Sequence, residues 1–247
     1  MAGFHTSSSP PPQCRRGPIN GDIEGQPVLA NGGSSSTQTS NNPPTALQQH
    51  VSFFDRDNDG IIWPSDVYSG FRALGFGVLF SLGSLLIPVF FSYPTRLGRS
   101  WVPDPLLRIY ARDIHKAKHG SDSGVYNFDG SFDADRFDRM FNYFDTSGTG
   151  GLSVGDLVAL LRKDRCAADP AGWSFAFMEW WTTWLLLQKD GRVSKDDLRA
   201  CYDGTLFWKI SEESSKGGGW QKGYGINEFL YSLWSSGTWK YWEAKTK

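Results

Sequence analysis

The sequence has few cysteines, few methionines and no excess of charge of either sign. Its three cysteines, Cys14, Cys166 and Cys201, are far apart and form no CxxC pair, which excludes a disulfide framework or a structural zinc site and favours a reducing, cytosol-facing location. The 26 acidic and 25 basic residues nearly balance and there is no basic tract, so we expect no nucleic-acid partner. The first residues include no apolar stretch, so we expect no signal peptide.

Composition divides the 247 residues into five regions. Residues 1–44 are rich in Ser, Pro, Gly and Asn, and we expect a disordered tail because such a segment buries too little apolar surface to offset its ordering entropy. We expect a helix–loop–helix unit over 45–72, an apolar lipid-anchoring segment over 73–96, a longer helical region over 97–210 and an aromatic tail over 211–247. The predicted fold class is therefore mainly α.

A helix is expected to start after Thr45, which is a suitable N-cap, because apolar residues then recur at helical spacing. A second helix is expected to start at Pro64, since proline suits the first turn of a helix. Between them, "DRDNDGIIWPSD" places four carboxylates within twelve residues. Like charges at this density repel, so the stretch predicts a bound cation, and a solvated acidic turn is the alternative.

The spacing of these carboxylates matches the calcium loop of an EF-hand. Calcium needs about six to eight oxygen ligands, which an EF-hand supplies from positions 1, 3, 5, 7, 9 and 12 around a glycine at position 6. Those positions hold Asp55, Asp57, Asp59, Ile61 (through its carbonyl), Trp63 (through water) and Asp66, and Gly60 is at position 6. Asp66 replaces the usual glutamate, and its shorter arm predicts weaker calcium binding and a smaller preference over magnesium.

A second segment, "DTSGTGGLSVGD", has the same spacing but only two carboxylates, Asp145 and Asp156. It follows a predicted helix whose Phe137, Met140, Phe141 and Phe144 share one face. EF-hands usually occur in pairs. We therefore expect this degenerate loop to pair with the first through short strands, without high calcium affinity.

No charge occurs between Arg72 and Arg96, and this stretch is long enough to cross a membrane. Pro88 and several glycines interrupt it, so a spanning helix, a hairpin dipping into one leaflet and a buried helix of a soluble protein all remain open. The Trp-rich stretch 173–187 is either core or a second membrane-surface helix.

The histidines are ambiguous on sequence alone. His50 is on an apolar helix face, where a hydrogen-bonded core residue is the ordinary interpretation. His115 and His119 are four residues apart and would share a face of a helix. This spacing also suits zinc, but no third and fourth ligand is nearby in sequence.

Three blocks, in this order, resemble the caleosin (peroxygenase) family: "LQQHVSFFDRDNDGIIWPSDVYSGFRALGFG", "IHKAKHGSDSGVYNFDGSF" and "VSKDDLRACYDGTLFW". They extend over about residues 45–210, and the termini look more like fungal members than seed members. The apolar segment has Pro88 and Pro94 but not the proline-knot spacing of seed caleosins.

The resemblance implies a calcium-binding, haem b-containing oxygenase of lipid droplets and endoplasmic reticulum, with its soluble parts in the cytosol. Such enzymes use fatty-acid hydroperoxides to hydroxylate or epoxidise unsaturated fatty acids, and the chain is compatible with a homo-oligomer. The family's haem histidines correspond to His50 and His119, which are the expected catalytic and haem-binding residues. The rival interpretations are a non-enzymatic, calcium-responsive lipid-droplet coat protein and a soluble calcium sensor. The low methionine content argues against the sensor.

Overall fold

The computed structural model describes residues 43–216 together with residues 227, 230 and 234. Nearly all of the predicted disordered tail, 1–44, and most of the predicted aromatic tail, 211–247, lie outside the described residues. The described chain is mainly helical, as predicted, with short two-stranded sheets between helices.

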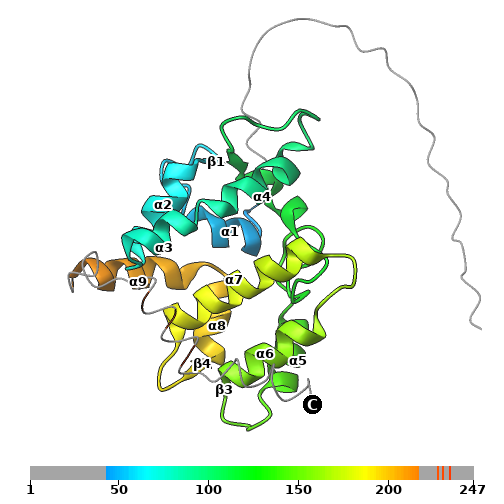
Figure 1. Ribbon diagram of the computed structural model, residues 1–247, viewed down its shortest axis with the longest axis vertical. Helices are drawn as coiled ribbons and strands as arrows, with labels where there is room; N and C mark the ends of the chain where they lie inside the picture. Colours follow the sequence, from blue (N-terminus) through cyan, green and yellow to red (C-terminus); the bar gives the residue numbers. More distant parts are fainter. Residues whose placement is uncertain (1–42, 217–226, 228–229, 231–233, 235–247) are drawn as a thin grey trace, which may run out of the picture. The chain divides into compact units, whose positions relative to one another are not determined.

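The first half of the described chain contains α1 (Ala46–Ser52), β1 (Ile61–Ile62), α2 (Pro64–Ala73), α3 (Val78–Gly83), α4 (Leu86–Arg96), β2 (Ile109–Tyr110) and the 3-10 helix η1 (Ala111–Ala117). The second half contains α5 (Ala134–Phe144), β3 (Gly151–Ser153), α6 (Val154–Lys163), α7 (Pro170–Leu187), β4 (Arg192–Ser194) and α8 (Lys195–Tyr202). Helix α9 (Thr205–Lys216) follows α8 and returns to pack on α2 of the first half (Figure 1).

The strand pairing differs from the prediction that the two loops 55–66 and 145–156 pair with each other. β1 pairs antiparallel with β2, with Ile62 opposite Ile109. β3 pairs antiparallel with β4, with Leu152 opposite Val193. Each loop therefore has its own partner strand. The prediction was wrong because neither partner segment has the alternating acids by which the two loops were found.

The strand registers show that the two partner segments have the same local form as the two loops. Gly60 and Gly150 lie two positions before the paired strand residues Ile62 and Leu152, and they have positive φ angles of 79° and 73°. Leu107 and Gly191 occupy the equivalent positions and have φ angles of 53° and 76°. The Ala111 N–H donates to Gly60 O (3.0 Å) just as the Lys195 N–H donates to Gly150 O (3.1 Å). The described chain therefore contains two pairs of helix–loop–strand–helix units.

The apolar segment forms a nearly continuous helical run, α3 followed by α4, and does not turn back as a hairpin (Figure 1). The run Val78–Arg96 has a mean hydropathy of 1.6 and is long and apolar enough to cross a membrane by length and composition alone. Pro88 does not break α4 because it is in the first turn, where no backbone donor is required.

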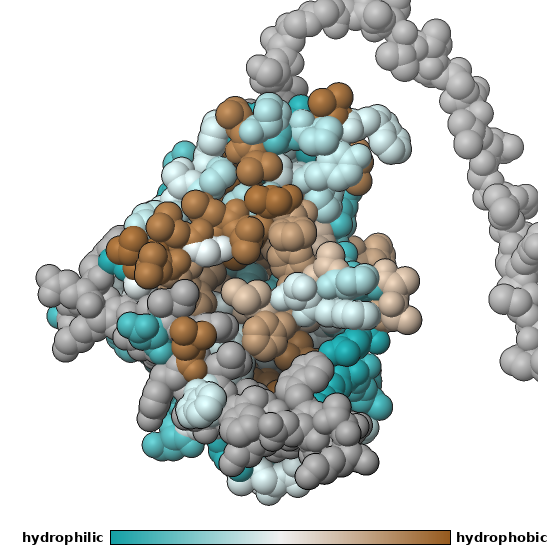
Figure 2. Space-filling model, viewed as in Figure 1, coloured by the Kyte–Doolittle hydropathy of each residue, from teal (hydrophilic) through white to brown (hydrophobic). Residues whose placement is uncertain are grey.

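The outer face of this run is more apolar than the solvent-facing side of an ordinary surface helix. Its buried positions are Ser81, Ser84, Pro88, Ser92 and Thr95, and the partly buried Phe80, Ile87 and Phe91 also pack against the core. Its outer face exposes Val78, Leu79, Leu82, Leu86, Val89, Phe90 and Tyr93. Hydrophobic atoms accordingly gather over α3 and α4 in Figure 2. A contiguous apolar surface of this kind marks a protein or membrane contact site.

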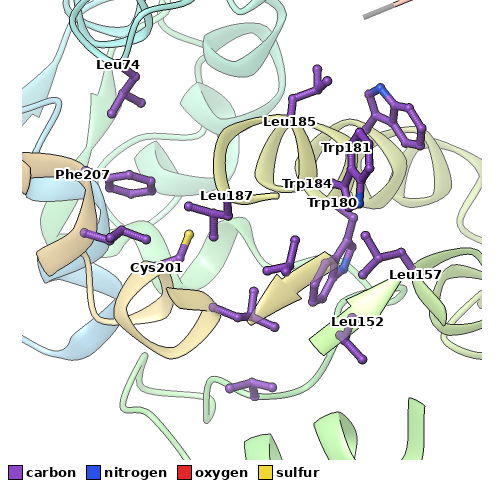
Figure 3. Packing of buried hydrophobic residues seen from close by; sticks show 14 of the residues in the cluster. Leu74, Leu152, Leu157, Trp180, Trp181, Trp184, Leu185, Leu187, Cys201 and Phe207 are labelled. Carbon is purple, nitrogen blue, oxygen red and sulfur yellow. The ribbon is translucent and has the colours of Figure 1, made fainter. Parts of the chain in front are cut away.

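The main core lies around α7, whose tryptophans Trp180, Trp181 and Trp184 are buried. In Figure 3, Leu157 of α6 lies beside the tryptophan side chains, and Cys201 and Phe207 lie beyond Leu187 at the end of the helix. Of the two interpretations of the Trp-rich stretch, the structure thus supports core.

Candidate metal loop and histidine site

The N-terminus of helix α1 is capped by residues of its own first turn. The Gln48 N–H donates to Thr45 Oγ1 (3.3 Å), and the Thr45 N–H donates to Gln48 Oε1 (2.9 Å), which together form a capping box. This confirms Thr45 as the N-cap. Helix α2 begins at Pro64, also as predicted. The acidic loop therefore lies between two helices whose ends were correctly located from sequence.

The loop brings three of its carboxylates together. Asp55, Asp57 and Asp59 each offer a carboxylate oxygen, and these oxygens lie within 4.8 Å of one another. Asp55 Oδ2 accepts the Gly60 N–H (3.0 Å), but its buried Oδ1 has no hydrogen-bond partner among the described residues. Burial raises the pKa of Asp55 against the effect of the Gly60 N–H, and the charges of Asp59 and Asp57 raise it further. The grouped carboxylate oxygens of this loop are the kind of donor that calcium prefers.

Asp66 and Ile61 occupy different positions from these three aspartates. Asp66 Oδ2 accepts the Trp63 N–H (2.9 Å) at the start of α2, and Asp66 is not part of the close carboxylate group. Ile61 begins β1, and its N–H donates to Asp59 Oδ1 (2.7 Å). A cation at the three aspartates would therefore have to draw the Asp66 carboxylate away from its capping bond.

His50 is held from one side of its ring. Its Nδ1 lies 2.7 Å from the carbonyl oxygen of Cys201, so Nδ1 carries the proton and donates. Burial lowers the pKa of His50, and the bond to Cys201 and the charge of Glu179 only partly offset this. Phe207 packs edge-on with its ring centre 4.9 Å away. The ring is thus neutral, with its lone pair on Nε2, which is the form in which histidine binds metals.

Gly204 makes this arrangement possible. It turns the chain between α8 and α9 with a φ of 79°, and an added Cβ would lie 2.5 Å from Gln49 O and 2.7 Å from His50 Cα. No other residue type fits both the conformation and the space. The glycine therefore lets the end of α8, with the Cys201 carbonyl, approach α1 closely.

His119 lies between two carboxylates. Its Nε2 is 3.7 Å from Glu179 Oε2 and its Nδ1 is 3.8 Å from Asp169 Oδ2. The Glu179 carboxylate raises the pKa of His119, while partial burial opposes it. The expected shared helix face of His115 and His119 is wrong, because η1 ends at Ala117 and is a 3-10 helix.

Glu179 lies beside His119, and sequence reasoning missed it. Its charge raises the pKa of His119 and partly offsets the burial that lowers the pKa of His50. The signal was present, because Glu179 is the only charged residue between Asp169 and Lys189. A lone carboxylate in a long uncharged stretch is unusual.

Two tyrosines complete the surroundings of His50. The Tyr126 ring packs edge-on with its centre 6.4 Å from the imidazole centre, and its hydroxyl donates to Tyr202 O. The Tyr202 hydroxyl is 2.7 Å from Ser123 Oγ. Burial raises the pKa of both phenols, so both hydroxyls remain protonated. The second block of the family resemblance thus contributes Tyr126 as well as His119.

These features define a class: a mainly helical protein with an acidic loop that groups three carboxylates, an apolar helical run soon after it, one histidine held by a backbone carbonyl and one flanked by carboxylates. The chain belongs to the caleosin family, because the family model described as "Caleosin related protein" matches residues 42–211. The family expectation from sequence is confirmed.

Curated relatives carry peroxygenase names. The chain is 38% identical over 171 residues to "Peroxygenase" of Lilium longiflorum, covering 68% of this chain and 71% of that protein. It is 41% identical over 174 residues to "Probable peroxygenase 4" of Arabidopsis thaliana, covering 68% of this chain and 87% of that protein. It is also 29% identical over 152 residues to a "Probable inactive peroxygenase-like protein" of Arabidopsis thaliana, covering 59% of this chain and 70% of that protein. No solved structure is similar enough to count as a match.

Proposed function

We propose that this caleosin is a calcium-binding haem peroxygenase that works at lipid surfaces. It would use fatty-acid hydroperoxides to hydroxylate or epoxidise unsaturated lipids, on lipid droplets and endoplasmic reticulum with its soluble parts in the cytosol. The observation that carries the proposal is the pair of contrasting histidines, one neutral and fixed, the other flanked by carboxylates. The peroxygenase names of the relatives support it.

His50 fits the role of haem ligand. Its Nδ1 proton is committed to the Cys201 carbonyl, so the free lone pair is on Nε2. Aromatic neighbours such as Phe207 provide the apolar surface that a porphyrin ring requires. Haem, when bound, supplies the iron at which the O–O bond of a hydroperoxide is cleaved.

His119 fits a different role. If both histidines bound the iron permanently, no face would remain open for a hydroperoxide. Glu179 and Asp169 lie 3.7 and 3.8 Å from the ring nitrogens of His119, so their charges raise the affinity of its neutral ring for a proton. We therefore assign His119 to the haem-binding site as an acid–base group. It would take the hydroperoxide proton and return it to the departing oxygen.

We further propose that residues 55–66 form an EF-hand calcium loop with Asp55, Asp57, Asp59, Ile61 and Asp66 as ligands. The unpartnered Oδ1 of Asp55 supports this, because a buried carboxylate oxygen without a donor is costly. Since α1 carries His50 and ends just before Asp55, calcium would fix the helix that holds the proposed haem ligand.

Calcium should stabilise the protein most at neutral pH. The raised pKa of Asp55 stabilises the calcium-free fold below the ordinary value of 3.8, and this contribution is lost as pH rises through the raised value. At neutral pH, bound calcium offsets the destabilisation that comes from ionising the buried Asp55. As pH falls toward 3.8, protons displace the calcium. Calorimetric melting with calcium and with chelator should give a Tm difference that shrinks on acidification. In Asp55→Ala the difference should vanish, and an undiminished difference in this variant would refute the site.

Asp66→Glu should tighten calcium binding by about tenfold, because the longer arm restores a bidentate contact. Asp156→Glu, the same change in the second loop, is the matched control and should leave calcium affinity unaltered. Titration calorimetry measures both. Equal affinities for the wild type and Asp66→Glu would place the last ligand elsewhere.

The second candidate function is a lipid-droplet coat protein without chemistry. The exposed apolar face of α3 and α4 favours it, since lipid docking does not require the histidines. The relative named as a probable inactive protein points the same way. Purified wild-type protein supplemented with haem distinguishes the two. A Soret absorbance band supports the enzyme, and a colourless protein that is inert toward fatty-acid hydroperoxides supports the coat. A homo-oligomer remains a prediction.

A further inference from the structure

The second loop, 145–156, already contains a cation, and this cation is an arginine of the chain itself. One guanidinium nitrogen of Arg192 lies 3.0 Å from Ser147 Oγ, 2.9 Å from Thr149 Oγ1 and 2.9 Å from the carbonyl oxygen of Gly151. These three oxygens are at loop positions 3, 5 and 7, from which an EF-hand binds calcium. Arg192 donates from β4, the partner strand of this loop.

The remaining oxygens of this loop are also satisfied. Asp145 Oδ2 accepts the Gly150 N–H (2.7 Å), and its Oδ1 accepts from Ser147 and Thr149. Asp156 Oδ2 accepts from Ser153, and its Oδ1 accepts from Thr146. Although burial opposes it, these hydrogen bonds and the charge of Arg192 lower the pKa of Asp145. In the first loop, by contrast, Asp55 Oδ1 has no hydrogen-bond partner among the residues that the structure describes.

The first pair of units has an arginine at the same place, but its guanidinium pairs with a carboxylate outside the loop. The strand registers make Arg108 the equivalent of Arg192. Arg108 Nε instead donates to the buried carboxylate of Asp104 (2.8 Å), and its guanidinium carbon lies 5.2 Å from the Trp63 ring centre. The residue equivalent to Asp104 in the second pair is Gln188, which is uncharged and accepts the Gly191 N–H. Nothing comparable restrains Arg192 within the described part of the chain.

We propose that loop 145–156 is a latent calcium site kept closed by the Arg192 guanidinium. The second pair of units is then assembled independently of calcium, and calcium responsiveness is confined to the loop 55–66. This inference deepens the calcium part of the proposed function. Only its statement about the loop 55–66 rests on the proposed function, because the contacts of Arg192 lie in the loop 145–156.

The test uses the full chain in an Asp55→Ala background, which silences the first loop. One protein adds Ser147→Asp and Thr149→Asp and keeps Arg192. A second adds Arg192→Leu to the same changes. Calcium titration calorimetry should show at least about tenfold tighter binding in the second protein, because the competing cation is gone. Lys189→Ala in place of Arg192→Leu removes a charge from the same segment without touching the loop oxygens, and should give no such gain.

A second measurement does not depend on engineered carboxylates. Arg192→Leu alone, in chelator, should lower Tm by at least about 4 °C, whereas Lys189→Ala should leave it nearly unchanged. Equal calcium affinities with and without Arg192 would overturn the proposal, as would equal melting of Arg192→Leu and Lys189→Ala. If wild type and Asp55→Ala bind calcium equally, the first-loop proposal fails, while both comparisons at Arg192 can still be interpreted.

Discussion

His50→Val is expected to lose haem, with the Soret absorbance of the purified protein reduced at least about tenfold. Valine fills part of the space of the imidazole on α1 but removes the Nε2 lone pair, which the Cys201 bond leaves free to ligate iron. The loss of hydroperoxide-dependent hydroxylation should equal the loss of haem. Absorbance spectra after haem supplementation, with protein concentration from amino-acid analysis, give the result directly.

His119→Gln should separate the two histidines. It should keep most of the Soret band but lose turnover by about 100-fold or more, because a general acid–base group typically contributes that much. His115→Val is the matched control, since His115 is on η1 near His119 and is assigned no part in the site. Full haem retention in His50→Val would contradict the assignment of His50 as the haem ligand. If only His119→Gln loses haem, then His119 is the ligand and His50 the acid–base group.

Leu86→Arg combined with Phe90→Arg should move the protein from floating lipid droplets to the soluble fraction. Both side chains are exposed, at 59% and 43%, on the outer face of α4. An arginine at the centre of a hydrocarbon layer costs about 2.5–3.5 kcal/mol, so two such changes should shift partitioning by well over tenfold. Flotation on a density gradient after expression in cells with lipid droplets measures the shift.

The control for surface charge is Tyr143→Arg, which changes a residue that is 60% exposed on α5, away from the apolar face. It should float like the wild type. Because the changed side chains are all exposed, and Phe90 loses only its edge-on contact with Phe175, Tm should remain within a few degrees of the wild type in both proteins. Undiminished flotation of the double variant would place the lipid contact elsewhere, and the exposed Phe177 and Met178 of α7 would be the next positions to change.

Local signals in the sequence were sufficient to predict individual elements. Thr45 and Pro64 located the ends of helices because a cap and a first-turn proline act within a few residues. Phe137 and Phe141 marked the buried face of α5 because helical periodicity is also local. The close group of Asp55, Asp57 and Asp59 followed from spacing alone, since a glycine-centred turn brings alternate side chains together.

Features that depend on distant contacts could not be predicted in this way. The pairing of Ile62 with Ile109 requires the chain to fold back onto β1 after the apolar run. The Cys201 carbonyl at His50 comes from 151 positions away, through a close approach that Gly204 allows. The outward apolar face of α4 was also hidden, because an uncharged sequence does not reveal that Ser92 and Thr95 point inward.

The claim that this caleosin is a peroxygenase is tested most directly by following the oxygen atom. Haem-supplemented wild-type protein would be mixed with an unsaturated fatty acid and a fatty-acid hydroperoxide whose peroxide oxygens carry a heavy isotope, and the products would be weighed by mass spectrometry. Transfer of the label into the epoxide or hydroxyl product, absent in His50→Val, is the predicted result. Unlabelled product, or no product from protein that contains haem, would contradict it.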